Sequence, residues 1–175
     1  MKHFIILLLF LSITQLNAKI LISPFDAMKS NFGDKTKIVK KNILLKNVQA
    51  KNVQTVAKVK LKSKIFKTFK AIKNKEVIGY GIIVNRKVRS KNAVVLYMIS
   101  KDGILKSMEI IAFNEPMEYI PSKTWQEQFK EIPTTKKLRL NKDIPTITGA
   151  TLSARSIVDG SRIAFAFYDE VLKGK

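Results

Sequence analysis

The chain of 175 residues has no cysteine and a single histidine, His3, close to its first residue. The lack of cysteine excludes disulfide bonds and thiolate chemistry, and a zinc site built from His and Cys ligands is excluded as well. Catalytic triads and acid–base schemes that depend on histidine are also excluded. The chemistry that remains open to this protein needs neither a thiol nor an imidazole.

Acidic residues and arginine are both scarce beside lysine. The sequence has 33 Lys and Arg residues against 13 Asp and Glu, which gives a formal net charge of +20. The arginines are Arg86, Arg89, Arg139, Arg155 and Arg162. Nucleic-acid-binding modules rely on guanidinium forks and on aromatic residues placed between basic ones, and no such stripe is present. We therefore expect no nucleic-acid partner, whereas the positive field favours peripheral contact with an anionic membrane surface.

Only the N-terminus carries a long apolar run. Residues 1–18, "MKHFIILLLFLSITQLNA", combine a basic start with an apolar stretch from Phe4 to Ile13, which is short of the roughly 20 residues of a membrane-spanning helix. This layout is typical of a secretory signal peptide, with cleavage expected after Ala18. Cleavage removes one basic residue, Lys2, and no acidic residue, so the charge becomes +19. We expect an exported protein, periplasmic in a host with two membranes; an uncleaved membrane anchor is the alternative.

The rest of the sequence predicts one α+β domain over residues 43–175, after an N-terminal segment, 19–42, that contains turn signals. Four runs predict strands because they alternate or are rich in β-branched residues: 64–72, 76–84, 92–100 and 104–113. The glycines in 76–84 indicate a bulge or a close approach of another backbone. The "KDG" at 101–103 predicts a hairpin turn.

Three helices are expected around these strands. The apolar spacing over 43–61 predicts a helix, with residues 44, 45, 48, 53, 56 and 57 on its buried face. A short helix is expected at 122–129 with Ser122 as its cap, and a longer one after Thr151. The resulting fold is α+β: an antiparallel sheet of about four strands packed by an N-terminal helix and a C-terminal helix.

The stretch "TITGATLSA" (146–154) precedes the last helix and is free of charge. In one interpretation Thr148 or Thr151 caps the helix and Gly149 takes a positive φ. In the other, the helix N-terminus stabilises a phosphate that is esterified to the Thr151 hydroxyl. Gly149 and Ala150 would keep the approach open for a bulky phosphate donor. The sequence leaves both interpretations open.

Residues 143–168, "DIPTITGATLSARSIVDGSRIAFAFY", resemble the signature of the FMN-binding domain family. This family includes the G subunit of the Rnf electron-transport complex and the C subunit of the sodium-translocating NADH:quinone reductase. Further similar elements are "VIGYG" (77–81), "VVLYMISKDGILKSMEIIAFNEP" (94–116) and "TWQEQF" (124–129). The resemblance therefore extends over about residues 77–168, with four elements in the same order.

The resemblance implies that a flavin transferase esterifies the phosphate of FMN to Thr151. It implies a cofactor site made of Thr148, Gly149, Ala150, Thr151, Ser153, Glu115 and Trp125. The implied function is electron transfer with a membrane redox complex or a secreted carrier as partner. The sequence departs from the family pattern at Pro145, where an aspartate is usual; Asp143 lies two residues earlier.

Several of these residues have structural interpretations that stay open. Glu115 belongs either to the cofactor site or to a solvated turn, and Trp125 lies either beside the flavin or in the core. Arg155 either faces the cofactor or pairs with Asp159 on the helix surface. For the whole protein, a basic envelope-binding module without flavin is the alternative function. A small flavin reductase is less favoured, because no acid–base pair in the sequence supports it.

Overall fold

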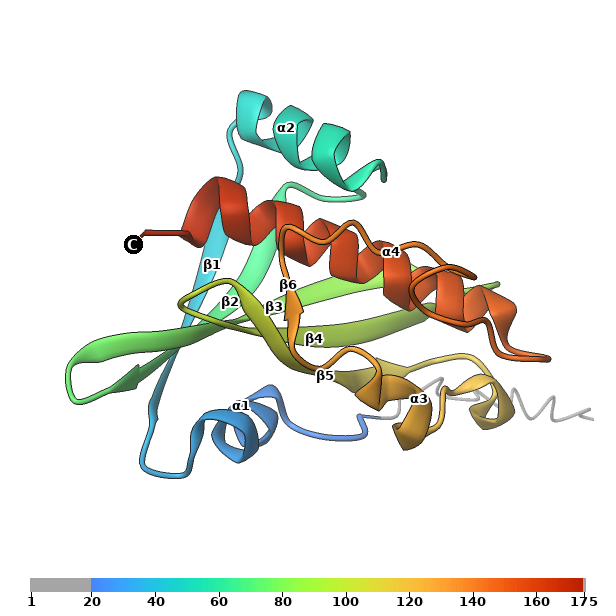
Figure 1. Cartoon of the computed structure of the whole chain (residues 1–175), viewed down its shortest axis with the longest axis horizontal. Coiled ribbons are helices and arrows are strands. Elements are labelled where there is room, and N and C mark those ends of the chain that lie inside the picture. Colours follow the sequence, from blue (N-terminus) through green and yellow to red (C-terminus); the bar gives the residue numbers. More distant parts are fainter. Residues whose placement is uncertain (1–19, 175) are drawn as a thin grey trace, which may run out of the picture.

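Six antiparallel strands form an open sheet in which the spatial order follows the chain order, β1 to β6 (Figure 1). The computed structural model describes residues 20–174, so the predicted signal peptide lies outside the described residues. The strands are β1 Lys37–Leu44, β2 Ile65–Lys73, β3 Glu76–Lys87, β4 Asn92–Ser100, β5 Ile104–Phe113 and β6 Ile132–Pro133. The fold is α+β, as the sequence predicts.

Within residues 20–174, four α-helices accompany the sheet: α1 Pro24–Phe32, α2 Asn47–Ala57, α3 Lys123–Glu127 and α4 Thr151–Phe167. A 3-10 turn, Met117–Tyr119, precedes α3, and a π-helical turn, Tyr168–Leu172, continues α4. Helix α4 crosses one face of the sheet and α1 lies on the opposite side (Figure 1). Helix α2 packs against α4.

The sheet buries apolar side chains on both faces. On the α4 face, Tyr80 and Ile82 of β3 and Tyr97 of β4 belong to the main hydrophobic core with the side chains of α4. On the other face, Phe69 and Leu96 pack with Met28 of α1 in a smaller core. Strands β2 to β5 therefore contain near-continuous buried runs, which is the reason why their sequences are rich in apolar residues.

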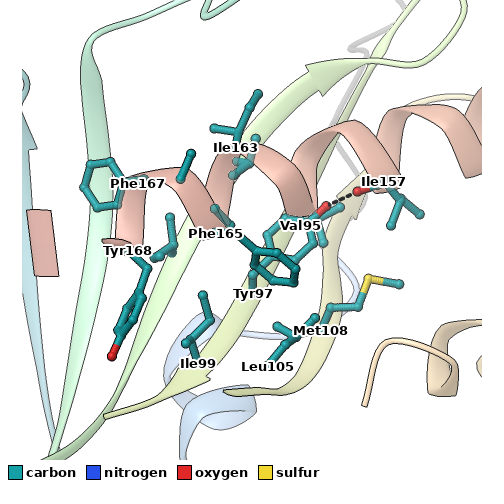
Figure 2. Close-up of a cluster of buried hydrophobic side chains, with 14 of the residues drawn as sticks. Val95, Tyr97, Ile99, Leu105, Met108, Ile157, Ile163, Phe165, Phe167 and Tyr168 are labelled. Atoms are coloured by element: carbon teal, nitrogen blue, oxygen red, sulfur yellow. Dashed lines mark hydrogen bonds between the residues drawn. The ribbon is translucent and has the colours of Figure 1, made fainter. Parts of the chain in front are cut away.

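Helix α4 lies directly on β4 (Figure 2). The hydroxyl of Tyr97 donates a hydrogen bond of 2.8 Å to the carbonyl oxygen of Ile157. A Cβ atom at Gly160 would collide with the Tyr97 hydroxyl, so glycine permits the helix to sit this close. Burial raises the pKa of Tyr97 far above its usual range, and the phenol stays a neutral donor. This contact fixes the position of α4 on the sheet, and with it the start of the helix at Thr151.

Several predicted elements need correction. Strands β1 and β6 were not expected: β1 is exposed along most of its length, so it shows no alternation, and β6 has two residues. The helix expected over 43–61 is α2, whose buried residues are Ala50, Val53 and Ala57, while Val48 and Val56 are exposed. Helix α1 and most of β1 lie in the segment 19–42, which therefore contributes to the same sheet.

The nearest atoms at the two glycines of β3 are side-chain atoms of α1, whereas the expectation was a bulge or a close approach of another backbone. A Cβ atom at Gly79 would meet the ring of Phe32, and one at Gly81 would meet the sulfur of Met28. The register with β2 also shifts beside Gly79, between Ala71 and Ile72. Within residues 20–174, no helix is long and apolar enough to cross a membrane, and no group of His, Asp and Glu residues is arranged to hold a metal ion.

Candidate functional site

A hollow of about 210 Å³ opens at the start of α4, where segments far apart in the sequence meet. The residues that line it are Val88, Arg89, Glu115, Tyr119, Gly149, Ala150, Thr151, Leu152 and Ser153. The turn between β3 and β4, the segment after β5 and the first turn of α4 each contribute a wall. The hollow thus places Glu115 beside the motif at 149–153.

The start of α4 is not capped by a threonine. The N-cap residue is Ala150, and no side chain of the described residues makes a capping hydrogen bond there. Thr151 is the first helical residue and is exposed, and its hydroxyl donates to the carbonyl oxygen of Ile147 at 3.3 Å. Gly149 has a positive φ of 79°, with open space where a Cβ would be. The prediction that Thr148 or Thr151 caps the helix is therefore wrong, and the Thr151 hydroxyl stays accessible.

The helix start leaves donors free toward the hollow. Among residues 20–174, no acceptor is found for the backbone N–H groups of Thr151, Leu152 and Ser153. The Ser153 hydroxyl is buried, with 1% of the residue exposed, and it has no hydrogen-bond partner in the described part of the chain. Free N–H groups at the positive end of a helix dipole favour an anion. An unpartnered buried hydroxyl is costly unless a ligand completes it.

Glu115 organises the turn that faces the helix start. Its Oε1 accepts backbone N–H groups from Arg89 at 3.0 Å, Ser90 at 2.6 Å and Lys91 at 2.6 Å. These bonds lower the pKa of Glu115 below its ordinary value, and the bond from Lys91 has the largest effect. Burial acts in the opposite direction but is outweighed. The Glu115 carboxylate is buried, and it is engaged by hydrogen bonds from the turn at 89–91. Its role in the structure is therefore to position the wall that carries Arg89.

Arg89 is the residue of the hollow that sequence reasoning missed. Its backbone is held by Glu115, while its guanidinium has no ion-pair partner among the described residues. The sequence around it, "KVRSKN" (87–92), reads as a solvated hairpin turn, so only the tertiary contact with Glu115 brings it to the site. Arg89 lines the hollow together with the first turn of α4, so it adds a positive charge to this site.

Trp125 lies in the core, as its structural interpretation predicts. It is 7% exposed, its ring lies 5.2 Å from that of Phe129, and it does not line the described hollow. Its Nε1 donates to the carbonyl oxygen of Pro145 at 2.9 Å. Trp125 therefore holds the backbone that leads into the motif. Thr148 is exposed and also does not line the hollow.

The residues before the motif are fixed as well. The Oδ2 atom of Asp143 accepts from the backbone N–H of Arg139 at 2.9 Å and from its Nε at 3.2 Å. The Arg139 side chain lowers the pKa of Asp143. Asp143 is therefore engaged within its own turn and does not line the hollow.

The helix surface beyond the first turn also differs from one expectation. Asp159 pairs with Arg86 of β3 at 3.1 Å and with Arg162 at 2.5 Å, so the predicted pair with Arg155 is wrong. Arg155 is exposed and has no ion-pair partner among the described residues. It remains a free positive charge one turn after Thr151.

A search against known protein families finds no match for this chain. A search of curated proteins likewise finds no match.

Proposed function

We propose that this protein is an exported flavoprotein that carries FMN as a phosphoester on Thr151 and relays electrons to or from a membrane or periplasmic redox partner. The proposal is supported by the resemblance of 143–168 to the FMN-binding domain family. The observation that carries it in the structure is the unpartnered buried hydroxyl of Ser153 beside the free N–H groups of the helix start. Both features favour an anion at the start of α4, and this supports the proposal.

The residues present fit the phosphate end of FMN. Ser153 and the N–H groups of 151–153 would donate to its oxygens, and Arg89 would balance its charge. A hollow of about 210 Å³ is smaller than the roughly 300–1,000 Å³ of sites that enclose a whole ligand. It therefore suits the phosphate and the adjoining chain. Leu152, which is 43% exposed at the rim, offers an apolar surface beyond it.

The chain itself supplies position and charge. When bound, FMN would supply the electron-transfer chemistry. Arg89 and Arg155 add positive charge near Thr151, which favours the reduced, anionic state of a flavin. Among the residues that line the described hollow, Glu115 is the acidic residue and is engaged by three backbone N–H groups. The site therefore suits a relay better than a reductase that acts on its own substrate.

The test is covalent labelling in the presence of an active flavin transferase. The full-length protein, co-expressed with the transferase, should gain the mass of one FMN and show in-gel fluorescence that survives denaturation. Thr151→Ala should abolish the label, and Thr151→Ser, which keeps the hydroxyl, should retain part of it. Thr146→Ala removes an exposed threonine outside the implied cofactor site and is the matched control, so it should be labelled like the wild type.

Replacing Pro145 with Asp tests the departure from the family pattern. If the missing acid limits recognition by the transferase, Pro145→Asp should raise the labelled fraction. An unlabelled wild type beside a transferase that labels another substrate contradicts the proposal and favours the basic envelope-binding module. A label that persists in Thr151→Ala shows a different attachment site.

A further inference from the structure

The ladder between β2 and β3 is incomplete. The strands pair from Thr68 opposite Ile82 to Lys73 opposite Glu76. Beyond the Thr68–Ile82 end of this ladder, residues 65–67 of β2 pair only with β1, and residues 83–87 of β3 pair only with β4. The two strands diverge (Figure 1), so two strand edges face each other with no described strand between them.

A groove of about 670 Å³ occupies this divergence. Its apolar walls come from both faces of the sheet. Phe66 and Ile163 belong to the core under α4, and Phe69 and Ile83 belong to the core over α1. Ile65, at the end of β2, also lines the groove and is 60% exposed. A strand placed here would find apolar contacts for side chains on both of its faces.

The groove is bordered by positive charge. Its basic lining residues are Lys40, Lys60, Lys62, Lys67 and Arg86, and no acidic residue lines it within the described part of the chain. Arg86 forms an ion pair with Asp159, which also pairs with Arg162. The four lysines are exposed, and no ion pair is found for them among residues 20–174. An occupant with negative charge at its ends complements this border.

The unpaired strand edges decide between two kinds of anionic occupant. A lipid-like chain would fill the apolar walls, but the backbone N–H and C=O groups of 65–67 and 83–87 that face away from β1 and β4 would gain no strand partner, which is costly in an apolar setting. An extended peptide satisfies these groups by adding a strand to an exposed edge.

We propose that the groove between β2 and β3 binds an extended segment of a partner protein, apolar over about five residues and flanked by acidic residues, as an added strand along residues 83–87. The open edge of β3, residues 83–87, then has the same length as the apolar centre of the bound segment. The groove contains none of the residues that line the hollow at Thr151, so this site works with or without a flavin.

The test uses the purified full chain and a display library of peptides. Each peptide has a five-residue centre drawn from Val, Ile, Leu, Phe, Tyr and Thr, with two acidic residues on each side. A second library with lysine in place of the acidic residues is the control. We expect enrichment from the acidic library alone. Selected peptides should slow amide hydrogen exchange at 65–67 and 83–87.

Two matched variants and one modified peptide make the outcome decisive. Lys60→Glu with Lys62→Glu should weaken binding at least about tenfold through repulsion of the acidic flanks. Lys51→Glu with Lys142→Glu changes the net charge equally at exposed lysines outside the groove and should have little effect. Methylation of alternate amide nitrogens in the peptide should also weaken it at least about tenfold by removing strand hydrogen bonds. Absence of enrichment, protection at other residues, or binding that survives N-methylation overturns the proposal; the last favours a lipid-like occupant.

Discussion

At the scale of single residues, two buried polar side chains of the same hollow are in opposite states. Glu115 accepts three backbone N–H groups and the Ser90 hydroxyl, whereas the Ser153 hydroxyl has no partner among the described residues. A satisfied buried group stabilises the fold and an unsatisfied one costs free energy. Substitutions of Glu115 and of Ser153 are therefore expected to change the free energy of unfolding in different ways.

Glu115 is expected to make the free energy of unfolding depend on acid pH. Its pKa is lowered in the folded protein from an ordinary value of 4.5. The stabilisation is therefore fully present above the unfolded pKa and is lost as the pH falls through the lowered folded pKa. Urea titrations from pH 7 to pH 3 should show that Glu115→Gln is less stable than the wild type at neutral pH. The difference should shrink in acid, and a constant difference would contradict this role.

Ser153 separates a ligand-binding role from a structural one. Because its buried hydroxyl has no partner, Ser153→Ala should leave the free energy of unfolding unchanged or raise it by up to about 1 kcal/mol. Flavin labelling of Thr151 should fall in the same variant. Ser161 is the matched control: its buried hydroxyl donates to Val158, so Ser161→Ala should lose about 0.5–1.5 kcal/mol. A large loss of stability in Ser153→Ala would point to a structural bond instead.

The sequence indicates the hydroxyl motif but not its surroundings. Thr151 and Glu115 were expected at one site through the resemblance, and the structure brings them to one hollow. The hydrogen bonds of Glu115 to the turn at 89–91 join residues about 25 positions apart, and no local pattern encodes them. Arg89 reaches the site only through these bonds, so sequence reasoning missed it.

At the scale of elements, the clearest constraint is the contact of α4 with β4. Helix propensity alone predicts that Gly160→Ala stabilises the helix by about 1 kcal/mol. The added Cβ would instead collide with the Tyr97 hydroxyl, and overpacking of a core costs about 1–3 kcal/mol. We expect the collision to dominate, because both residues are buried. Denaturant unfolding should show a loss of stability that is smaller in a Tyr97→Phe background; an equal loss in both backgrounds would exclude the proposed contact.

The elements that the sequence predicts well are those with one dominant pattern. Strands β2 to β5 and helix α4 carry long apolar runs because both faces of the sheet are covered. Strand β1 is an exposed edge rich in lysine, so its apolar residues follow neither the two-residue period of a strand nor the 3.6-residue period of a helix. Helix α1 begins within "SPF": Ser23 is the N-cap and accepts from the backbone N–H of Phe25, and Pro24 is the first helical residue. The residues "SPF" also predict a turn, and the contacts of α1 with the sheet favour the helix.

At the scale of the whole molecule, the net charge of +20 predicts attraction to any polyanion. The Debye length shortens from about 10 Å at 0.1 M salt to about 3 Å at 1 M. Binding to vesicles that contain anionic lipid should therefore fade steeply with salt in co-sedimentation assays, and vesicles of neutral lipid should not bind. Binding to DNA should show the same salt dependence without sequence preference. A salt-resistant and sequence-selective complex with DNA would contradict the expectation of no nucleic-acid partner.

The anchored backbone before Thr151 bears on the order of events in maturation. The side chain of Trp125 in α3 donates to the carbonyl oxygen of Pro145, and Asp143 accepts from Arg139 within its own turn. The first of these bonds needs α3, so the segment before the motif is fully anchored only once α3 has formed. Any enzyme that modifies Thr151 would meet a folded surface, not a flexible peptide. For a chain exported in an unfolded state, attachment of a cofactor would then be a late step that follows folding. The presence of the cofactor would mark those molecules that have folded.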